Sequence, residues 1–184
     1  MSCARRGDGR VLCWGSTGFF DMESGSSSDV LEPTVAPVPG LRDVAQVAVG
    51  FDHGCGRHTD GTVSCWGSGS AIGRDTPGPV TAPIRRALGD VIDLAAGTGS
   101  TCARTRSGPA LCWGRYGHSA SGAAFSEAPV EVPWLAGAKA LALGLSHSCA
   151  ILADGAAACW GDNGEGQLGD GTMAERRVAT PVRW

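Results

Sequence analysis

Three stretches of the chain share one alternation of apolar side chains, and each ends at a glycine. They read AQVAVG (45–50), IDLAAG (92–97) and KALALG (139–144). The larger residues recur at every second position, and the opposite face carries alanine each time, at Ala48, Ala95 and Ala142. A period of two predicts a β-strand. Small apolar residues on the second face indicate a strand that is buried on both sides, with one neighbour close by.

A β-hairpin is predicted after each of these strands. The turns lie at residues 7–9, 59–61, 106–108 and 153–155, and each ends in glycine. A three-residue loop that closes on a left-handed glycine is a common hairpin connection. Folding the chain about 153–155 places Cys149 opposite Cys159, at a non-hydrogen-bonded position where Cα atoms lie ~4.5 Å apart.

A short strand containing proline follows a variable loop rich in glycine and serine. Its four copies are Pro37-Val38, Pro83-Ile84, Pro129-Val130 and Pro181-Val182. The repeated unit is therefore strand, hairpin, loop and strand, with no helix signal. Units of this kind, about 50 residues long, favour an all-β fold made of β-propeller blades. A blade packs both faces on its neighbours, which explains a strand that is apolar on both sides.

Cysteine and tryptophan divide the chain into repeats. The eight cysteines form four pairs ten residues apart, and Trp-Gly follows the second cysteine of each pair. The landmarks define an incomplete repeat at about 1–40 and complete ones at 41–87, 88–135 and 136–184. We therefore expect three complete blades and one incomplete blade, as part of a larger propeller. The tryptophans of this motif are Trp14, Trp66, Trp113 and Trp160.

Composition excludes several other classes. The 184 residues include 29 glycines and 10 prolines, 42 % are apolar and 18 % are charged. This apolar content is too high for a disordered chain, and this much glycine is costly in a helical bundle. The net charge is −3 with no basic block, so no nucleic-acid partner is expected. No apolar run approaches the ~20 residues of a membrane span.

The cysteine pairs predict four structural disulfides. An even count at a repeated spacing is typical of an oxidising compartment, so we expect an extracellular or periplasmic protein. With no signal peptide visible, this expectation rests on the cysteines alone. Reduced, buried thiols are the alternative for a cytosolic protein. A metal site formed with His53 or His147 is disfavoured, because zinc ligands favour cysteines two to four residues apart. No metal or cofactor is expected. The predicted pairs are Cys3–Cys13, Cys55–Cys65, Cys102–Cys112 and Cys149–Cys159.

The last copy, LALGLSHSCAILADGAAACWGDNGEGQLGDGT (141–172), closely resembles the regulator-of-chromosome-condensation repeat. His53 matches the motif histidine in the second copy, whereas Ser100 replaces it in the third. The paired cysteines are similar to a bacterial, exported branch of such repeats. The resemblance implies structural roles for the motif residues, which are Gly50, His53, Trp66, Gly97, Trp113, Gly144, His147, Trp160, Gln167, Leu168 and Gly169.

The resemblance implies a propeller that commonly has seven blades, or about 340 residues at this repeat length. The chain would then be about half a ring, and three readings stay open. It is part of a longer reading frame, it self-associates through open strand edges, or it closes as a four-bladed ring. The last is awkward, because the first copy lacks the buried strand.

The leading functional hypothesis is a non-enzymatic protein-interaction scaffold whose protein partner is unknown. The resemblance also implies two alternatives: a regulator like a guanine-nucleotide exchange factor, and a secreted enzyme-inhibitor propeller. No carboxylate or nucleophile recurs beside His53 or His147, so no enzymatic activity and no catalytic residue are expected.

Binding residues are expected where the copies differ. The irregular loops carry Phe19 and Phe20 in the first copy, and Arg115, Tyr116 and His118 in the third. Aromatic and arginine side chains on exposed loops are common interface anchors. For the two phenylalanines, filling a gap in blade packing is an equally open reading.

Overall fold

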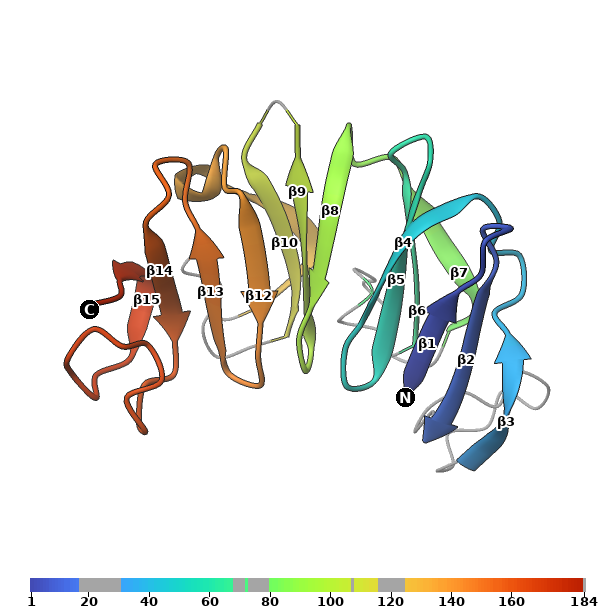
Figure 1. The fold of residues 1–184 in the computed structure, drawn as a ribbon, viewed down its shortest axis with the longest axis horizontal. Helices are drawn as coiled ribbons and strands as arrows, with labels where there is room; N and C mark the ends of the chain where they lie inside the picture. Colours follow the sequence, from blue (N-terminus) through green and yellow to red (C-terminus); the bar gives the residue numbers. More distant parts are fainter. Residues whose placement is uncertain (17–30, 68–71, 73–79, 107, 116–124, 184) are drawn as a thin grey trace.

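Four antiparallel sheets stand side by side in an arc (Figure 1). The structure is a computed structural model that describes residues 1–16, 31–67, 72, 80–106, 108–115 and 125–183. The only helix in these ranges is the single 3₁₀ turn Pro133–Leu135, so the all-β prediction is confirmed. The first and fourth sheets occupy the two ends of the arc, which is open rather than a closed ring of four.

Each sheet falls inside one of the four predicted repeats and forms one blade. The first blade is β1 (Ser2–Arg5), β2 (Val11–Ser16) and β3 (Leu31–Pro37). The second is β4 (Val44–Val49), β5 (His53–His58), β6 (Val63–Gly67) and β7 (Val80–Arg86). The third is β8 (Val91–Ala96), β9 (Ser100–Thr105), β10 (Ala110–Arg115) and β11 (Phe125–Val132). The fourth is β12 (Ala140–Leu143), β13 (His147–Ile151), β14 (Ala157–Gly161) and β15 (Arg176–Pro181).

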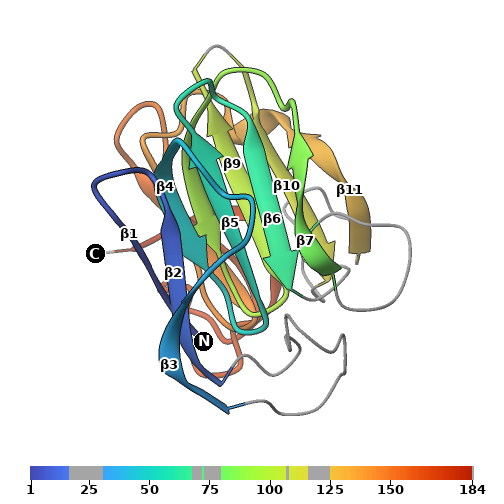
Figure 2. The same ribbon diagram turned by 90° about the vertical axis from the view of Figure 1, so that its right-hand side faces the viewer.

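The strands of each blade pair in sequence order. In the described ranges the first blade has no counterpart of β4, β8 and β12, so β1 forms the edge of its sheet. Figure 2 shows this three-stranded blade at the end of the row. The predicted hairpin register is also confirmed, because Cys149 lies opposite Cys159 with their Cα atoms 4.1 Å apart.

Neighbouring blades pack through a repeated contact between a disulfide and a tryptophan. Successive residues of a strand point to opposite faces. We call the face toward the next blade in the chain the forward face, and the opposite one the backward face. The Cys55–Cys65 disulfide, on the forward face of the second blade, shares a buried cluster with Trp113 of the third. Cys13 packs with Trp66 in the same way, and Cys102 and Cys112 pack with Trp160.

We call β4, β8 and β12 the inner strands, and the predicted alanine of each pairs with the first cysteine of a disulfide across the sheet. Ala48 pairs with Cys55 across the sheet, and therefore shares the forward face with the disulfide. It packs against the cluster that contains Leu94 and Trp113 of the third blade. A larger side chain here would hold the next blade away, which explains why the sequence keeps alanine on one face and larger residues on the other.

The turns after the inner strands connect one blade to the next. The Phe51 N–H donates to the Gly97 carbonyl oxygen, and the Thr98 N–H donates to the Gly144 carbonyl oxygen, both at 3.3 Å. A Cβ atom at Gly50 would overlap the Gly97 oxygen, so this close approach requires glycine. The predicted glycines at the ends of β4, β8 and β12 therefore sit at the blade junctions.

The long loop of the fourth blade closes around one buried amide. The Asn163 side chain donates to the Thr172 and Ala174 carbonyl oxygens at 2.9 and 3.1 Å. Its own Oδ1 accepts the Leu168 N–H at 2.9 Å, and both residues are fully buried. Gln167 donates to Asp162 at 3.0 Å, and Gly169 has a φ of 62°. Gln167, Leu168 and Gly169, which the sequence predicted as structural motif residues, therefore help to hold the conformation of this loop.

Acid should destabilise this loop through Asp170. Its carboxylate accepts hydrogen bonds from Thr172 and Arg176, at 2.7 and 2.6 Å, and these bonds hold its pKa well below the usual range. A pKa that is lower in the folded state stabilises above the unfolded value of about 4, and that stability is lost as the pH falls. We expect the free energy of unfolding of Asp170→Asn, measured in urea, to fall less steeply below pH 4 than that of wild type. Equal slopes would contradict this, and Asp154→Asn in the exposed hairpin turn is the control.

Candidate functional site

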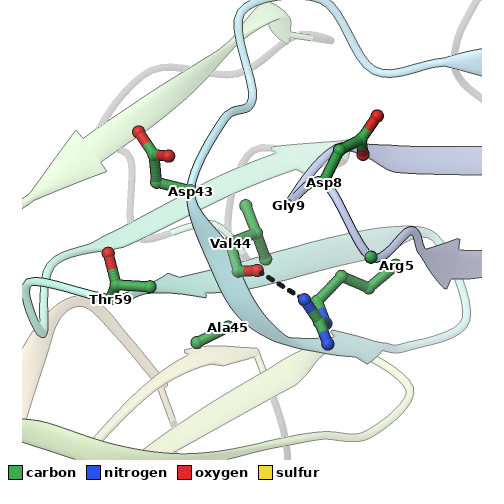
Figure 3. Close-up of a pocket in the computed structure, with 8 residues that line it drawn as sticks. Arg5, Asp8, Gly9, Asp43, Val44, Ala45 and Thr59 are labelled. Carbon is green, nitrogen blue, oxygen red and sulfur yellow. Dashed lines mark hydrogen bonds between the residues drawn. The ribbon is translucent and has the colours of Figure 1, made fainter.

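Two equivalent grooves open on the hairpin-turn edge, one at each of two successive blade junctions. The first lies between the first and second blades, has a volume of about 350 Å³ and is lined by Arg5, Asp8, Asp43, Val44 and Thr59 (Figure 3). The second, of about 340 Å³, lies between the second and third blades. Its lining includes Arg57, Asp60, Asp90, Val91 and Arg106.

The two grooves use the same positions of the repeat. Arg5 and Arg57 each follow the first cysteine of a pair by two residues, and Asp8 and Asp60 each precede the hairpin glycine. Asp43 and Asp90 each come directly before the inner strand. The last matching position differs in charge, because Thr59 of the first groove corresponds to Arg106 of the second. The two clefts therefore repeat one arrangement with locally different side chains.

Backbone contacts shape the floor of the first groove. The Val44 N–H donates to the Gly9 carbonyl oxygen at 3.0 Å, which joins the hairpin turn of the first blade to the start of β4. Figure 3 shows the Arg5 guanidinium reaching the Val44 carbonyl oxygen, a contact of 3.4 Å. Asp43 is the one described residue other than glycine with a positive φ, at 55°. The groove is thus built on a bent backbone that both blades hold in place.

The second groove carries charges of both signs. Arg106 Nε lies 3.9 Å from Asp90, and its side chain is 75 % exposed. The hydrogen bonds that Asp60 accepts from Thr62, together with the nearby Arg85 guanidinium, lower the pKa of Asp60 to about 2. The Asp60 carboxylate is therefore charged at neutral pH. Exposed arginine and aspartate within one cleft can pair with the charged side chains of a bound polypeptide.

The predicted structural residues lie at the blade junctions. All eight cysteines are in the four disulfides Cys3–Cys13, Cys55–Cys65, Cys102–Cys112 and Cys149–Cys159. Trp66, Trp113 and Trp160 are buried. None of these cysteine and tryptophan side chains lines the two grooves. They pack in the clusters between neighbouring blades.

The motif histidine joins two blades. His53 is fully buried, and its Nε2 lies 2.8 Å from Thr101 Oγ1 of the third blade. His147 holds the matching position in the fourth blade. A second buried histidine, His58, contacts the Arg42 carbonyl oxygen and Ser64 Oγ, each at 2.8 Å. Sequence reasoning missed His58, since the other copies have no histidine at its position.

The predicted binding residues are only partly within the described chain. Phe19, Phe20, Tyr116 and His118 lie outside the described residues. Arg115 ends β10, where its backbone pairs with Phe125. The groove residues were not predicted as a site, although arginine two residues after the first cysteine recurs at Arg5, Arg57 and Arg104 and was an available signal.

The described residues contain no group of three or more histidine, cysteine, aspartate or glutamate side chains that could hold a metal ion. Within the same residues, no helix is long and apolar enough to cross a membrane.

Sheets of three or four antiparallel strands, packed face to face in an arc, define this chain as a segment of a β-propeller. Residues 44–71 and 138–167 match the family model described as the regulator of chromosome condensation (RCC1) repeat. These two segments therefore carry repeats of this type, as the sequence predicted. No curated protein sequence matches the chain.

Solved propellers share the fold. Human WBSCR16 superimposes with a TM-score of 0.78 at 22 % identity, over 99 % of this chain and 50 % of its own. Yeast RCC1 (Prp20) bound to Kap60 superimposes with a TM-score of 0.75 at 25 % identity, over 99 % of this chain and 46 % of the Prp20 chain. A second structure of Prp20p, from Saccharomyces cerevisiae, superimposes with a TM-score of 0.78 at 22 % identity. This match covers 99 % of this chain and 48 % of Prp20p. The chain thus spans about half the length of these solved relatives.

Proposed function

We propose that this chain is a non-enzymatic protein-interaction scaffold that works in an oxidising, extracellular or periplasmic compartment. The observation that carries the proposal is the pair of equivalent grooves on the hairpin-turn edge, with arginine and aspartate at repeated positions. A rigid sheet scaffold that displays variable side chains at a fixed spacing is a common design for protein recognition.

The chemistry of the grooves favours a polypeptide partner. Asp60 and Arg106 place opposite charges in one open cleft, whereas a small-molecule site is usually concave and mostly apolar. The solved yeast relatives are described as bound to Kap60 and as binding Gsp1p and histones. These partners belong to those proteins, and they support protein binding as the general role proposed for this chain.

The four disulfides support the proposed compartment, because such bonds persist where the surroundings are oxidising. The exchange-factor and enzyme-inhibitor alternatives stay predictions. They differ in the partner they require, a GTPase for the first and a secreted enzyme for the second, so identifying the partner separates them.

Charge reversal in the second groove should weaken partner binding. We expect Arg106→Glu to lower affinity for a captured partner about tenfold, which corresponds to about 1.4 kcal/mol. Arg177→Glu is the matched control, because Arg177 is 77 % exposed and pairs with Glu175 at 3.6 Å, much as Arg106 is 75 % exposed and 3.9 Å from Asp90. The measurement is chemical cross-linking and affinity capture in the native host, followed by titration of the purified partner. Equal losses of affinity in both variants would contradict binding through the second groove. So would the failure to capture any partner at physiological salt.

A further inference from the structure

Arg57, on the wall of the second groove, differs from the arginines at the same position of the neighbouring repeats. Arg5 donates to the Val44 carbonyl oxygen of the next blade at 3.4 Å. Arg104 donates to the equivalent oxygen in the fourth blade, that of Ala138, at 2.7 Å. Among the described residues, Arg57 makes no hydrogen bond to the blade that follows it. Its guanidinium is therefore not used to join two blades.

The residue that faces Arg57 across its sheet is uncharged. Arg104 faces Asp93 and forms an ion pair with it, 3.0 Å from Nε to the carboxylate. Arg57 instead faces Gln46, whose Oε1 accepts a hydrogen bond from Arg57 Nε at 3.4 Å. The Gln46 amide also donates to Asp93 at 2.6 Å, so that carboxylate is shared between Gln46 and Arg104. Arg57 is left as a half-buried cation with only a neutral partner, and burial of a charge is costly until it is paired.

A second arginine reaches the same groove from the third blade. Arg106 lies 3.9 Å from Asp90, which is a long ion pair, and its side chain is 75 % exposed. The other aspartate of the groove, Asp60, is bound from outside the lining residues. Its carboxylate accepts hydrogen bonds from Arg85 and from the Thr62 hydroxyl, each at 2.6 Å. The groove therefore carries more arginine charge than its own aspartates neutralise.

The two grooves are continuous, because Thr59 lines both of them. Figure 3 shows Thr59 and Asp43 on the same side of Val44 in the first groove. The Asp43 carboxylate has no ion-pair partner in the described part of the chain. The sign of the unpaired charge thus changes along the path, from arginine in the second groove to aspartate in the first. A nucleic acid would bring a phosphate to both places, whereas an extended polypeptide can place an acidic side chain at one and a neutral or basic one at the other.

We propose that the second groove binds an aspartate or glutamate side chain of an extended polypeptide segment, between Arg57 and Arg106. The neighbouring residues of that segment run past Thr59 into the first groove. Guanidinium groups bind carboxylates through paired, charge-assisted hydrogen bonds, and a partner carboxylate supplies the pairing that Gln46 does not. This inference rests on the interaction role proposed above, and it adds the chemistry of the partner: an acidic segment of a protein.

Selection of a displayed random-peptide library on the full chain, with its disulfides intact, tests the proposal. We expect the enriched peptides to share one aspartate or glutamate. These peptides are then synthesised with a fluorescent label and titrated by fluorescence anisotropy. Arg57→Gln and Arg106→Gln should each lower the affinity about tenfold, which corresponds to about 1.4 kcal/mol. Arg177→Gln is the control and should bind as wild type does, because Arg177 is 77 % exposed and lies on β15, away from the grooves. Unchanged far-ultraviolet circular dichroism shows that each variant is folded.

A double-mutant cycle gives the decisive result. Replacing the shared acid of the peptide by its amide should cost as much affinity as Arg57→Gln. The two changes together should cost no more than either one alone, because both remove the same contact. Additive losses of affinity would overturn the contact, even if each single change weakens binding.

The remaining outcomes separate this inference from the proposed function. Peptides without a shared acid, or peptides that bind Arg57→Gln as tightly as wild type, would overturn the acidic partner and leave the scaffold role intact. A library that yields no binder would also overturn the peptide site, whereas the scaffold role is tested by capture of a partner from the native host. Displacement of the peptide by a single-stranded oligonucleotide, at a lower concentration than the unlabelled peptide needs, would overturn the proposal in favour of a nucleic acid.

Discussion

Trp113→Ala should lower the free energy of unfolding by about 3–5 kcal/mol, the usual cost of removing a large aromatic side chain from a core. The Trp113 side chain is 1 % exposed and packs in one cluster with Cys55, Cys65 and Leu94. Its removal leaves a cavity between the second and third blades, beside the Cys55–Cys65 disulfide and Leu94. Because this cluster joins two blades, the substitution should destabilise the second blade as well as the third.

Urea unfolding followed by far-ultraviolet circular dichroism measures this loss. Phe51→Ala is the control, since it also removes an aromatic ring but from a side chain that is 73 % exposed. Surface substitutions of that kind usually change stability by less than about 0.5 kcal/mol. A loss below about 1 kcal/mol for Trp113→Ala would mean that the blades do not depend on the tryptophan–disulfide contact.

The second large effect is expected from removing one disulfide. Replacing Cys55 and Cys65 together by alanine should lower the free energy of unfolding by about 3 kcal/mol, from the entropy of an 11-residue loop in the unfolded chain. A further loss is expected from packing, because both sulfur-bearing residues are buried against Trp113. The expected total loss is therefore larger than for a disulfide with a more exposed cysteine.

Replacing Cys3 and Cys13 by alanine is the matched control. That disulfide has the same sequence separation of 10, so the loop-entropy part is equal, but Cys3 is only half-buried. The two double variants should therefore differ in free energy of unfolding, measured in urea, by the packing contribution alone. Equal losses of stability would contradict a packing contribution. Counting thiols on the purified protein without reductant tests the bonds themselves. Eight reactive thiols would refute the disulfides, and with them the proposed oxidising compartment.

The fold could be predicted from the sequence because its signals are local. The two cysteines of a hairpin are ten residues apart, and the turn between them sets their register. The irregularity beside each tryptophan was missed. The strand that carries each tryptophan shifts register there, on β2, β6, β10 and β14. Gly67 and Gly114 have φ values of 105° and 112°. The glycine after each tryptophan was an available signal for this β-bulge.

The grooves could not be predicted in the same way, because their walls come from different repeats. Arg57 and Asp90 become neighbours only when the second and third blades pack, and spacing within one repeat does not reveal this. His53 shows the same limit. Its recurrence predicted a structural role, but its partner Thr101 lies 48 residues away on a strand with no histidine.

The four disulfides have a consequence for how such a chain can change over time. Each bond lies within one hairpin, so no covalent cross-link joins two blades. A duplicated or deleted repeat carries its own pair of cysteines and leaves every other pairing intact. The number of blades can therefore vary by recombination of whole repeats without creating an unpaired thiol, and oxidative folding of each hairpin does not depend on how many neighbours it has.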